Sequence, residues 1–204
     1  MRQLLASLAI TLGVVGVAHA DLQGDADAAA GRDKAAACAA CHGPAGISIA
    51  PAFPNLAGQQ ASYLAKQIMD IRDATRSVPQ MAGQVDNFSD QDAWDVAIYY
   101  AGQEPAVGQA DPALVERGEA LYRAGDMAKG IPACAACHTP TGAGIGSAVY
   151  PALSGQHAGY IESTLKAFAA GDRTNDPNGV MGDIAAKMSD ADMAAAANYV
   201  LGLH

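Results

Sequence analysis

The sequence predicts an all-α protein made of two tandem copies of one small domain. Apolar residues recur at helical spacing in several segments, and no segment alternates polar and apolar residues for long enough to suggest a strand. Motifs of the first half also return in the second half, after shifts of 96 to 100 residues. Because the whole chain has 204 residues, each copy spans fewer than about 100, the size of a small domain.

The repeated motifs define the two copies and the segment that joins them. They are Cys-Ala-Ala-Cys-His at 38–42 and 134–138, Pro-x-Leu-x-Gly-Gln at 54–59 and 151–156, and Ser-Asp-x-Asp at 89–92 and 189–192. Segment 103–112 contains two prolines and a glycine, so it is the expected linker. We therefore expect an N-terminal domain at 21–102 and a C-terminal domain at 113–204, related by internal duplication.

Each copy is expected to form three helices. An alanine-rich helix leads to the Cys-Ala-Ala-Cys-His motif, and an amphipathic helix follows a loop rich in Gly and Pro. The last helix begins after Ser89 or Ser189, because both are good N-cap residues with acidic residues in the first turn. The expected helices cover 25–37, 61–72 and a segment from 90 in the first copy, and 112–125, 158–170 and a segment from 190 in the second.

Residues 1–20 have the pattern of a secretory signal that is cleaved after Ala20. Arg2 supplies the positive start, residues 4–17 are apolar or small, and residues 18–20 have the small-x-small form of a cleavage site. The alternative is a membrane anchor, but the apolar run is shorter than the roughly 20 residues that span a bilayer. No later segment is apolar enough to span one. We therefore expect a periplasmic protein.

The charge balance restricts the partners of the exported chain. Without Arg2, the 12 basic residues become 11 against 21 acidic ones, a formal charge of −10. Such a surface argues against nucleic acid and against anionic membranes as partners. The sequence leaves a loose peripheral association with a membrane open.

The two Cys-Ala-Ala-Cys-His motifs have the form of covalent haem attachment sites. Thiols at i and i+3 bond to the haem vinyl groups as thioethers, and the His that follows binds the iron. The alternatives are disulfides or a thioredoxin-like motif in an oxidising compartment, and zinc. A disulfide does not require a His after both motifs, and a structural zinc site usually groups its ligands as two spaced pairs. The expected cofactors are two haem c groups, attached through Cys38, Cys41, Cys134 and Cys137 and bound at iron by His42 and His138. Because domains this small and alanine-rich would have meagre cores, we expect each haem to be part of the fold.

The repeat also selects a second axial ligand for each iron. Met81 and Met181 both lie eight residues before the Ser-Asp-x-Asp motif, and no other pair of methionines coincides in this way. Both are expected in loops, from which a thioether could reach the iron and raise its potential. The alternative is that both are simply buried loop residues. His157 aligns with Gln60, so it is not a ligand common to both copies and is expected at the surface or at a helix start.

At this point the sequence resembles the cytochrome c4 family, di-haem class I c-type cytochromes of the bacterial periplasm. The resemblance covers the whole chain after residue 20. It is based on the paired motifs, on Gly-Asp-Arg-Thr-Asn-Asp at 171–176 and on Tyr-Val-Leu-Gly-Leu-His at 199–204. It implies two tandem class I cytochrome c domains whose haems face each other across the domain interface. The ligand pairs it implies are His42 with Met81 and His138 with Met181.

The resemblance also implies roles for residues around the iron ligands. Pro54 and Pro151 match the loop proline whose carbonyl accepts a hydrogen bond from the ligand imidazole, although a simple turn proline is the alternative. Arg76 and Arg173 recur at matching positions and could neutralise haem propionates, with a solvated surface charge as the alternative.

The function that the resemblance implies is transfer of single electrons from a cytochrome bc complex to a terminal oxidase, so the protein is expected to be a carrier and not an enzyme. Two alternatives stay open at this stage. One is the haem subunit of a larger oxidoreductase, such as a sulfide dehydrogenase of the flavocytochrome c type. The other is a di-haem peroxidase, which would need one iron with a free coordination position.

Overall fold

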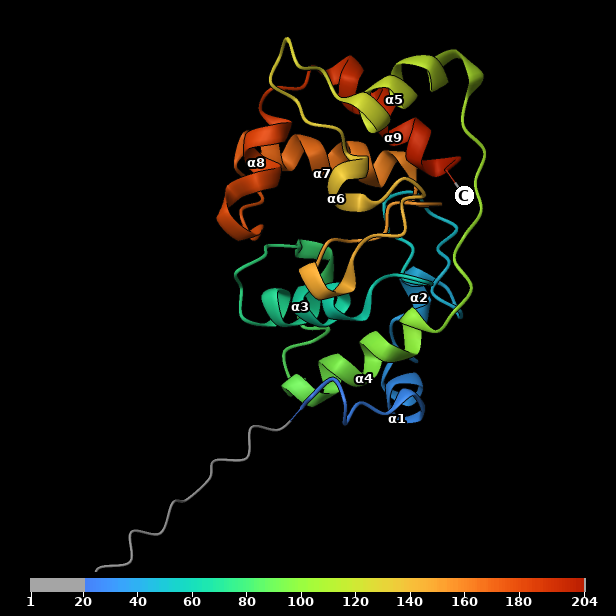
Figure 1. Ribbon diagram of the computed structural model, residues 1–204. Coiled ribbons are helices and arrows are strands. Elements are labelled where there is room, and N and C mark those ends of the chain that lie inside the picture. Colours follow the sequence, from blue (N-terminus) through green and yellow to red (C-terminus); the bar gives the residue numbers. More distant parts are fainter. Residues whose placement is uncertain (1–20, 204) are drawn as a thin grey trace, which may run out of the picture.

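The computed structural model describes residues 21–203, and within that range the protein is all-α, as predicted (Figure 1). The expected export signal at 1–20 lies outside the described residues. The first domain contains α1 (Ala28–Lys34), α2 (Ala39–His42), α3 (Ala61–Arg72), the 3-10 turn η1 (Pro79–Met81) and α4 (Asp90–Ala101). The second contains α5 (Pro112–Ala124), α6 (Ala135–His138), η2 (Gly146–Ala148), α7 (Ala158–Ala170), η3 (Pro177–Gly179), α8 (Val180–Ala185) and α9 (Asp190–Leu201). Among residues 21–203, β-type pairing of the backbone is limited to two isolated antiparallel bridges.

The amphipathic helices and the last helices form where the sequence predicts them. The helices α3 and α7 have the expected bounds, and α4 and α9 begin directly after Ser89 and Ser189. Both serines accept a hydrogen bond from the N3 amide, and the N3 aspartate side chain accepts one from the serine amide, which is a complete capping box. The first helix is shorter than the predicted 25–37 because Asp27 caps it at its N-terminus and the chain leaves the helix after Lys34.

In each domain the last helix packs against both of the longer helices that precede it. The helix α4 contacts α1 and α3, and α9 contacts α5 and α7. The crossings of α1 with α4 and of α5 with α9 are close because a glycine lies at each of them. A Cβ atom at Gly31 would lie 1.9 Å from the carbonyl oxygen of Asp95, and one at Gly118 would lie 2.3 Å from that of Ala195. Glycine is therefore required at both crossings.

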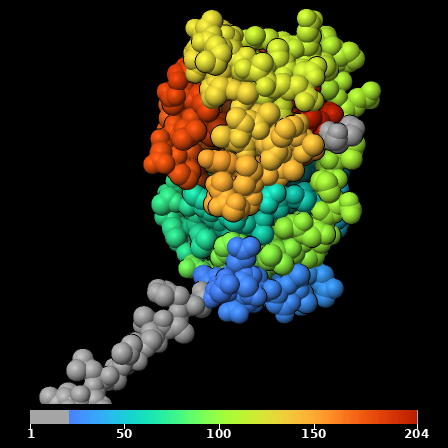
Figure 2. All heavy atoms as spheres, in the orientation of Figure 1, coloured from blue at the N-terminus to red at the C-terminus, as the bar shows by residue number. Residues whose placement is uncertain are grey.

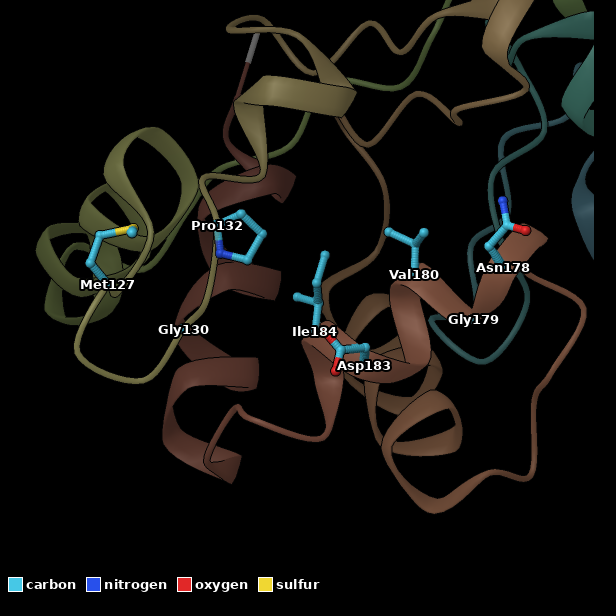
Figure 3. A pocket seen from close by; sticks show the side chains of 8 residues that line it. All are labelled: Met127, Gly130, Pro132, Asn178, Gly179, Val180, Asp183 and Ile184. Atoms are coloured by element: carbon cyan, nitrogen blue, oxygen red, sulfur yellow. The ribbon is translucent and has the colours of Figure 1, made fainter.

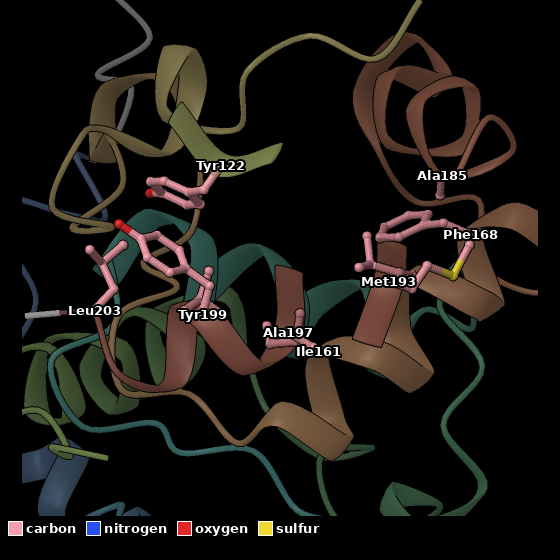
Figure 4. Packing of buried hydrophobic residues seen from close by; sticks show 10 residues of the cluster. Tyr122, Ile161, Phe168, Ala185, Met193, Ala197, Tyr199 and Leu203 are labelled. Carbon is pink, nitrogen blue, oxygen red and sulfur yellow. The ribbon is translucent and has the colours of Figure 1, made fainter. Parts of the chain in front are cut away.

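Each domain has a small apolar cluster of its own. The cluster of the second domain joins α5, α7, α8 and α9, and its tyrosine pair, Tyr122 and Tyr199, has ring centroids 5.5 Å apart (Figure 4). The cluster of the first domain is smaller, with Leu64, Val96 and Tyr100 as its large buried members. Three of the six buried members of the first cluster are alanines, so it buries little apolar surface for a domain of this size.

The two domains are stacked on each other, with the segment between α4 and α5 running along one side (Figures 1 and 2). That segment lies close to both domains. A Cβ atom at Gly58 would lie 2.8 Å from Pro105, and one at Gly155 would lie 1.9 Å from the carbonyl oxygen of Ala106. None of the helices in residues 21–203 is both long and apolar enough to cross a membrane.

Asp192 ties the start of α9 to the segment ahead of the second Cys-Ala-Ala-Cys-His motif. It is 3% exposed. Its carboxylate accepts hydrogen bonds from Lys129 Nζ at 2.6 Å and from Arg117 Nη2 at 2.6 Å, in addition to closing the capping box. Burial alone would raise the pKa of Asp192, but the hydrogen bonds from Lys129, Arg117 and Ser189 outweigh it and hold the pKa well below its ordinary value.

We expect Asp192→Asn to lower the free energy of unfolding of the haem-loaded protein by about 2 kcal/mol at neutral pH, because two cations lose a buried partner. The folded-state pKa is depressed, so this stabilisation is complete above the ordinary carboxyl pKa of 3.8 and is lost as the pH falls below it. The difference between wild type and variant should therefore shrink between about pH 5 and about pH 2 in urea unfolding followed by circular dichroism. Asp183→Asn, which removes an exposed ion pair to Lys187, is the control. Equal losses in the two variants would contradict the assignment.

Candidate functional site

The two Cys-Ala-Ala-Cys-His motifs form matching one-turn helices. Cys38 lies at the N-cap of α2 and Cys134 at the N-cap of α6, and each helix ends at its His. None of the four cysteines forms a disulfide, so the disulfide alternative is not present in this structure. Burial raises the pKa of Cys38 and raises that of Cys134 to about 11. Such surroundings suit an uncharged sulfur, and a thioether is uncharged.

Each His is held by a proline carbonyl in the loop that follows. The Nδ1 atom of His42 lies 2.9 Å from the carbonyl oxygen of Pro54, and the same atom of His138 lies 2.9 Å from that of Pro151. A carbonyl can only accept, so Nδ1 carries the proton and Nε2 keeps its lone pair. Burial lowers the pKa of both imidazoles, which favours the neutral form that binds a metal. Each imidazole is therefore fixed with Nε2 available as a ligand.

Met81 and Met181 lie in different local structures. Met81 is the last residue of the 3-10 turn η1 and is half-buried. Met181 is the second residue of α8, so the prediction that both methionines lie in loops is wrong for Met181. The reason is Asp176, whose Oδ2 accepts hydrogen bonds from the amides of Met181 at 2.8 Å and Gly182 at 3.1 Å. These bonds satisfy amides at the start of α8.

The remaining methionines and His157 have other surroundings. Met69 packs against the first apolar cluster, Met193 belongs to the second, and Met188 packs against that one. Met127 is 81% exposed. His157 is the N-cap residue of α7, as the helix-start prediction has it, and its Nε2 lies 2.9 Å from the carbonyl oxygen of Ser48 in the other domain.

A cavity of about 520 Å³ lies beside Met181 (Figure 3). Three residues that precede the second Cys-Ala-Ala-Cys-His motif line one side of it, Met127, Gly130 and Pro132. The other side is lined by residues of η3 and α8, namely Asn178, Gly179, Val180, Asp183 and Ile184. Met127 and Val180 form part of its rim and are 81% and 44% exposed. The first copy has no segment that corresponds to residues 126–132, so this rim is specific to the second domain.

The loops that hold the two imidazoles also form the domain interface. Gln59 donates from Nε2 to the carbonyl oxygen of Ala152 at 2.9 Å and accepts from the Ala152 amide at 2.7 Å. Gln156 makes the same pair of bonds with Asn55, at 2.9 and 2.8 Å. The shift of 97 residues that relates the copies converts one pair into the other, so the interface has the pseudo-twofold form of a symmetric dimer. Asn55 and Ala152 directly follow Pro54 and Pro151.

Arg76 and Arg173 lie at the same interface and exchange partners across it. Arg76 donates from Nη2 to the hydroxyl of Tyr160 at 3.1 Å, and Arg173 donates from Nη2 to the hydroxyl of Tyr63 at 3.0 Å. The shift of 97 residues again relates the two bonds. The structure therefore brings the two arginines together at the domain boundary, and each bonds to a tyrosine of the other domain.

Comparisons with known proteins agree with this arrangement. The family model described as cytochrome c matches residues 115–204, and the model described as cytochrome c oxidase, cbb3-type, subunit III matches residues 25–99. A cytochrome c4 from Azotobacter vinelandii is 52% identical over 100% of both chains. The crystal structure of reduced recombinant cytochrome c4 from Pseudomonas stutzeri superimposes with a TM-score of 0.86 at 46% identity, over 88% of this chain and 100% of that one.

The chain belongs to the cytochrome c4 family. It is also similar to a thiosulfate dehydrogenase electron acceptor from Thiomonas intermedia, at 40% identity over 84% of this chain and 81% of that protein. Members of the cytochrome c4 family are di-haem electron carriers and not enzymes. These comparisons confirm the resemblance to the cytochrome c4 family and the predicted fold class of two cytochrome c domains.

This cytochrome c4 family member holds two covalently bound haem c groups, one for each Cys-x-x-Cys-His motif. The residues present fit that cofactor. No cysteine is in a disulfide, the imidazoles are buried with Nδ1 bonded to a carbonyl, and Cys134 and Met181 pack against the same apolar cluster. In the first domain Cys38 packs against the corresponding cluster. A haem against each cluster would supply the apolar surface that these alanine-rich domains lack.

The sequence did not reveal which residues join the domains of this cytochrome c4 family member. Gln59, Gln156, Tyr63 and Tyr160 stand out in the repeat because each recurs in both copies, but recurrence does not distinguish a core position from an interface position. Gln67 does not recur at all, since the matching residue is Thr164. Its contacts become visible only in the folded protein.

Proposed function

We propose that this cytochrome c4 family member carries single electrons in the periplasm, from a quinol-oxidising cytochrome bc complex to a terminal oxidase. Family membership supports the carrier role, and the N-terminal sequence pattern supports export with cleavage after Ala20. Each haem iron, when bound, supplies a one-electron couple whose potential the axial ligands set.

The proposed site assigns the same roles in both domains. Cys38, Cys41, Cys134 and Cys137 attach the haems, and His42 with Met81 and His138 with Met181 are the axial ligands. Pro54 and Pro151 orient the imidazoles through the 2.9 Å contacts described above. With both axial positions filled, the iron would have no place for a substrate. The residues of this chain would then keep the surroundings of the iron unchanged while the iron gains or loses an electron.

One observation carries the proposal of a two-centre carrier. The loop residues that hold the imidazoles are followed directly by the residues that hold the other domain, Asn55 with Gln156 and Ala152 with Gln59. Movement of one domain against the other would therefore disturb both imidazoles. The two centres are held at a fixed separation, and an electron that enters at one domain needs no diffusional encounter to reach the other.

The apolar rim beside Met181 is the proposed contact for redox partners, because an exposed patch of this kind is typical of small transient interfaces. The chain is acidic, so a partner with a basic docking surface would be attracted to it. The test is oxidation of the reduced protein by membranes that contain the terminal oxidase, and reduction of the oxidised protein by the bc complex. Both rates should fall with added salt. Failure of both reactions would overturn the proposed route.

One comparison supports a different electron donor. The Thiomonas intermedia relative is named as an electron acceptor of thiosulfate dehydrogenase, so an enzyme that oxidises an inorganic sulfur compound is the alternative source of electrons. Reduction by such a dehydrogenase with thiosulfate, without reduction by the bc complex, would favour this alternative. Copurification with a flavoprotein would instead favour a subunit of a larger oxidoreductase.

The arginines provide a test of the proposed propionate role. Arg76→Gln and Arg173→Gln should each lower a midpoint potential, by on the order of tens of millivolts, because removing a nearby positive charge favours the oxidised iron. Spectroelectrochemical titration of each variant measures this. Lys166→Gln, which removes a cation paired with Glu162 at the surface of α7, is the control. Unchanged potentials in both arginine variants would count against the role.

A further inference from the structure

The loop ahead of Met181 is bound to the other domain, whereas its counterpart in the first domain is bound mainly to its own. Asn175 donates from Nδ2 to Gln67 Oε1 at 2.9 Å and to Asp70 Oδ2 at 2.6 Å. Its carbonyl oxygen accepts from Lys66 Nζ at 3.0 Å. Gln67 and Asp70 lie on α3 of the first domain, and Lys66 also pairs with Asp70. Among residues 21–203, the matching loop 73–81 makes one hydrogen bond across the interface, from Arg76 to Tyr160.

Gln67 is the centre of this arrangement. It is 6% exposed, and its Oε1 also accepts from Arg76 Nη1 at 2.8 Å and from Arg173 Nη2 at 3.0 Å. The helix α7 cannot act in the same way on the first domain. In α7 the residues that match Lys66, Gln67 and Asp70 are Ser163, Thr164 and Ala167, which offer neither a carboxylate nor an amide oxygen. The asymmetry is therefore present in the sequence of the two copies and not only in the loop conformation.

The bound loop leads directly to Met181. Asn175 is followed by Asp176, whose carboxylate holds the amides of Met181 and Gly182 at the start of α8. Hydrogen bonds from α3 to Asn175 and from the amide of Met181 to Asp176 are thus linked through the peptide bond between Asn175 and Asp176. These bonds fix the backbone of Met181, and a shift of this backbone would strain the contacts with α3.

We propose that Lys66, Gln67 and Asp70 of the first domain are positioning residues that hold Met181 of the second domain on its iron. This inference depends on the proposed function, because it takes Met181 to be an axial ligand. It makes the two centres unequal. The contacts with α3 favour the position in which Met181 binds its iron and so resist its displacement by a competing ligand, whereas Met81 lacks this support.

The experiment uses imidazole as the competing ligand on the oxidised, haem-loaded full-length protein. Proton NMR follows the methyl groups of the two methionines separately, each assigned by substitution of its own Met, and the near-infrared Met–iron band reports the total. Asp70→Ala should lower the imidazole concentration that displaces Met181 by about tenfold, the change expected when hydrogen bonds to a charged group are removed. Gln67→Met, which keeps the volume of a buried side chain, should act in the same direction. In Asp70→Ala, Met81 should respond as in wild type, because among residues 21–203 the Asp70 side chain bonds only to Lys66 and Asn175, whereas Gln67 also holds Arg76 of the loop ahead of Met81.

Glu162→Gln is the matched control, because it removes an ion pair of the same i,i+4 spacing on α7 that does not reach the other domain. It should leave both methionines unchanged. Equal sensitisation of Met81 and Met181 in Asp70→Ala would indicate general destabilisation and overturn the inference, and so would no change at Met181 in either α3 variant. Absence of the Met181 signal from the wild-type protein would instead overturn the proposed ligand set, so the two failures are distinguishable.

Discussion

Replacing Met181 with Ala is expected to remove the contribution of one of two centres to the near-infrared band that marks Met–iron(III) coordination. The midpoint potential of that centre should fall by on the order of 100 mV or more, because a thioether ligand favours the reduced iron and axial ligands set haem potentials over a wide range. Met81→Ala should have the same effect on the other centre. Spectroelectrochemical titration of the two variants measures both quantities.

Met69→Ala is the control for these substitutions. Met69 packs against the first apolar cluster from within α3, so its loss should reduce stability and leave the near-infrared band intact. If either Met81→Ala or Met181→Ala kept the full band, that methionine would not be a ligand. The repeat-based selection of the pair would then be wrong.

Gln156→Ala is expected to lower the free energy of unfolding of the haem-loaded protein by about 3 kcal/mol. The substitution leaves the amide and the carbonyl of Asn55 without partners at a buried interface, and each unsatisfied group costs about 1–3 kcal/mol. Denaturant unfolding followed by circular dichroism measures the loss. Gln103→Ala, which removes a hydrogen bond to Tyr99 within one domain, is the control and should cost less than about 1 kcal/mol. A similar loss in both variants would show that the cross-domain bonds do not stabilise the assembly.

Much of the fold could be predicted from local sequence because its signals are local. The serine caps of α4 and α9 and the apolar spacing of α3 and α7 depend on residues three or four positions apart, and the observed bounds follow them. The α-helix over 180–185 was not predicted. It depends on Asp176, which lies ahead of η3 and acts as an acceptor for amides five and six residues later.

Some residues of the candidate site could likewise be predicted from the sequence, and others could not. The haem motifs and the spacing of Met81 and Met181 can be read from the repeat, which compares the chain with itself. Contacts between the copies cannot be read in this way. The bond from Arg76 to Tyr160 spans 84 residues and that from Asn175 to Gln67 spans 108, and residues so far apart leave no local pattern. Gln67 could be found only from its place in the folded interface.

The central claim is that each of two haem irons is bound by one His and one Met of this chain. The most direct test is the haem content of the purified protein together with the near-infrared spectrum of its oxidised form. The account predicts two haems per chain, a Met–iron(III) band with the amplitude of two centres, and no high-spin absorption. One haem per chain, a band with the amplitude of a single centre, or a high-spin component from either iron would contradict it.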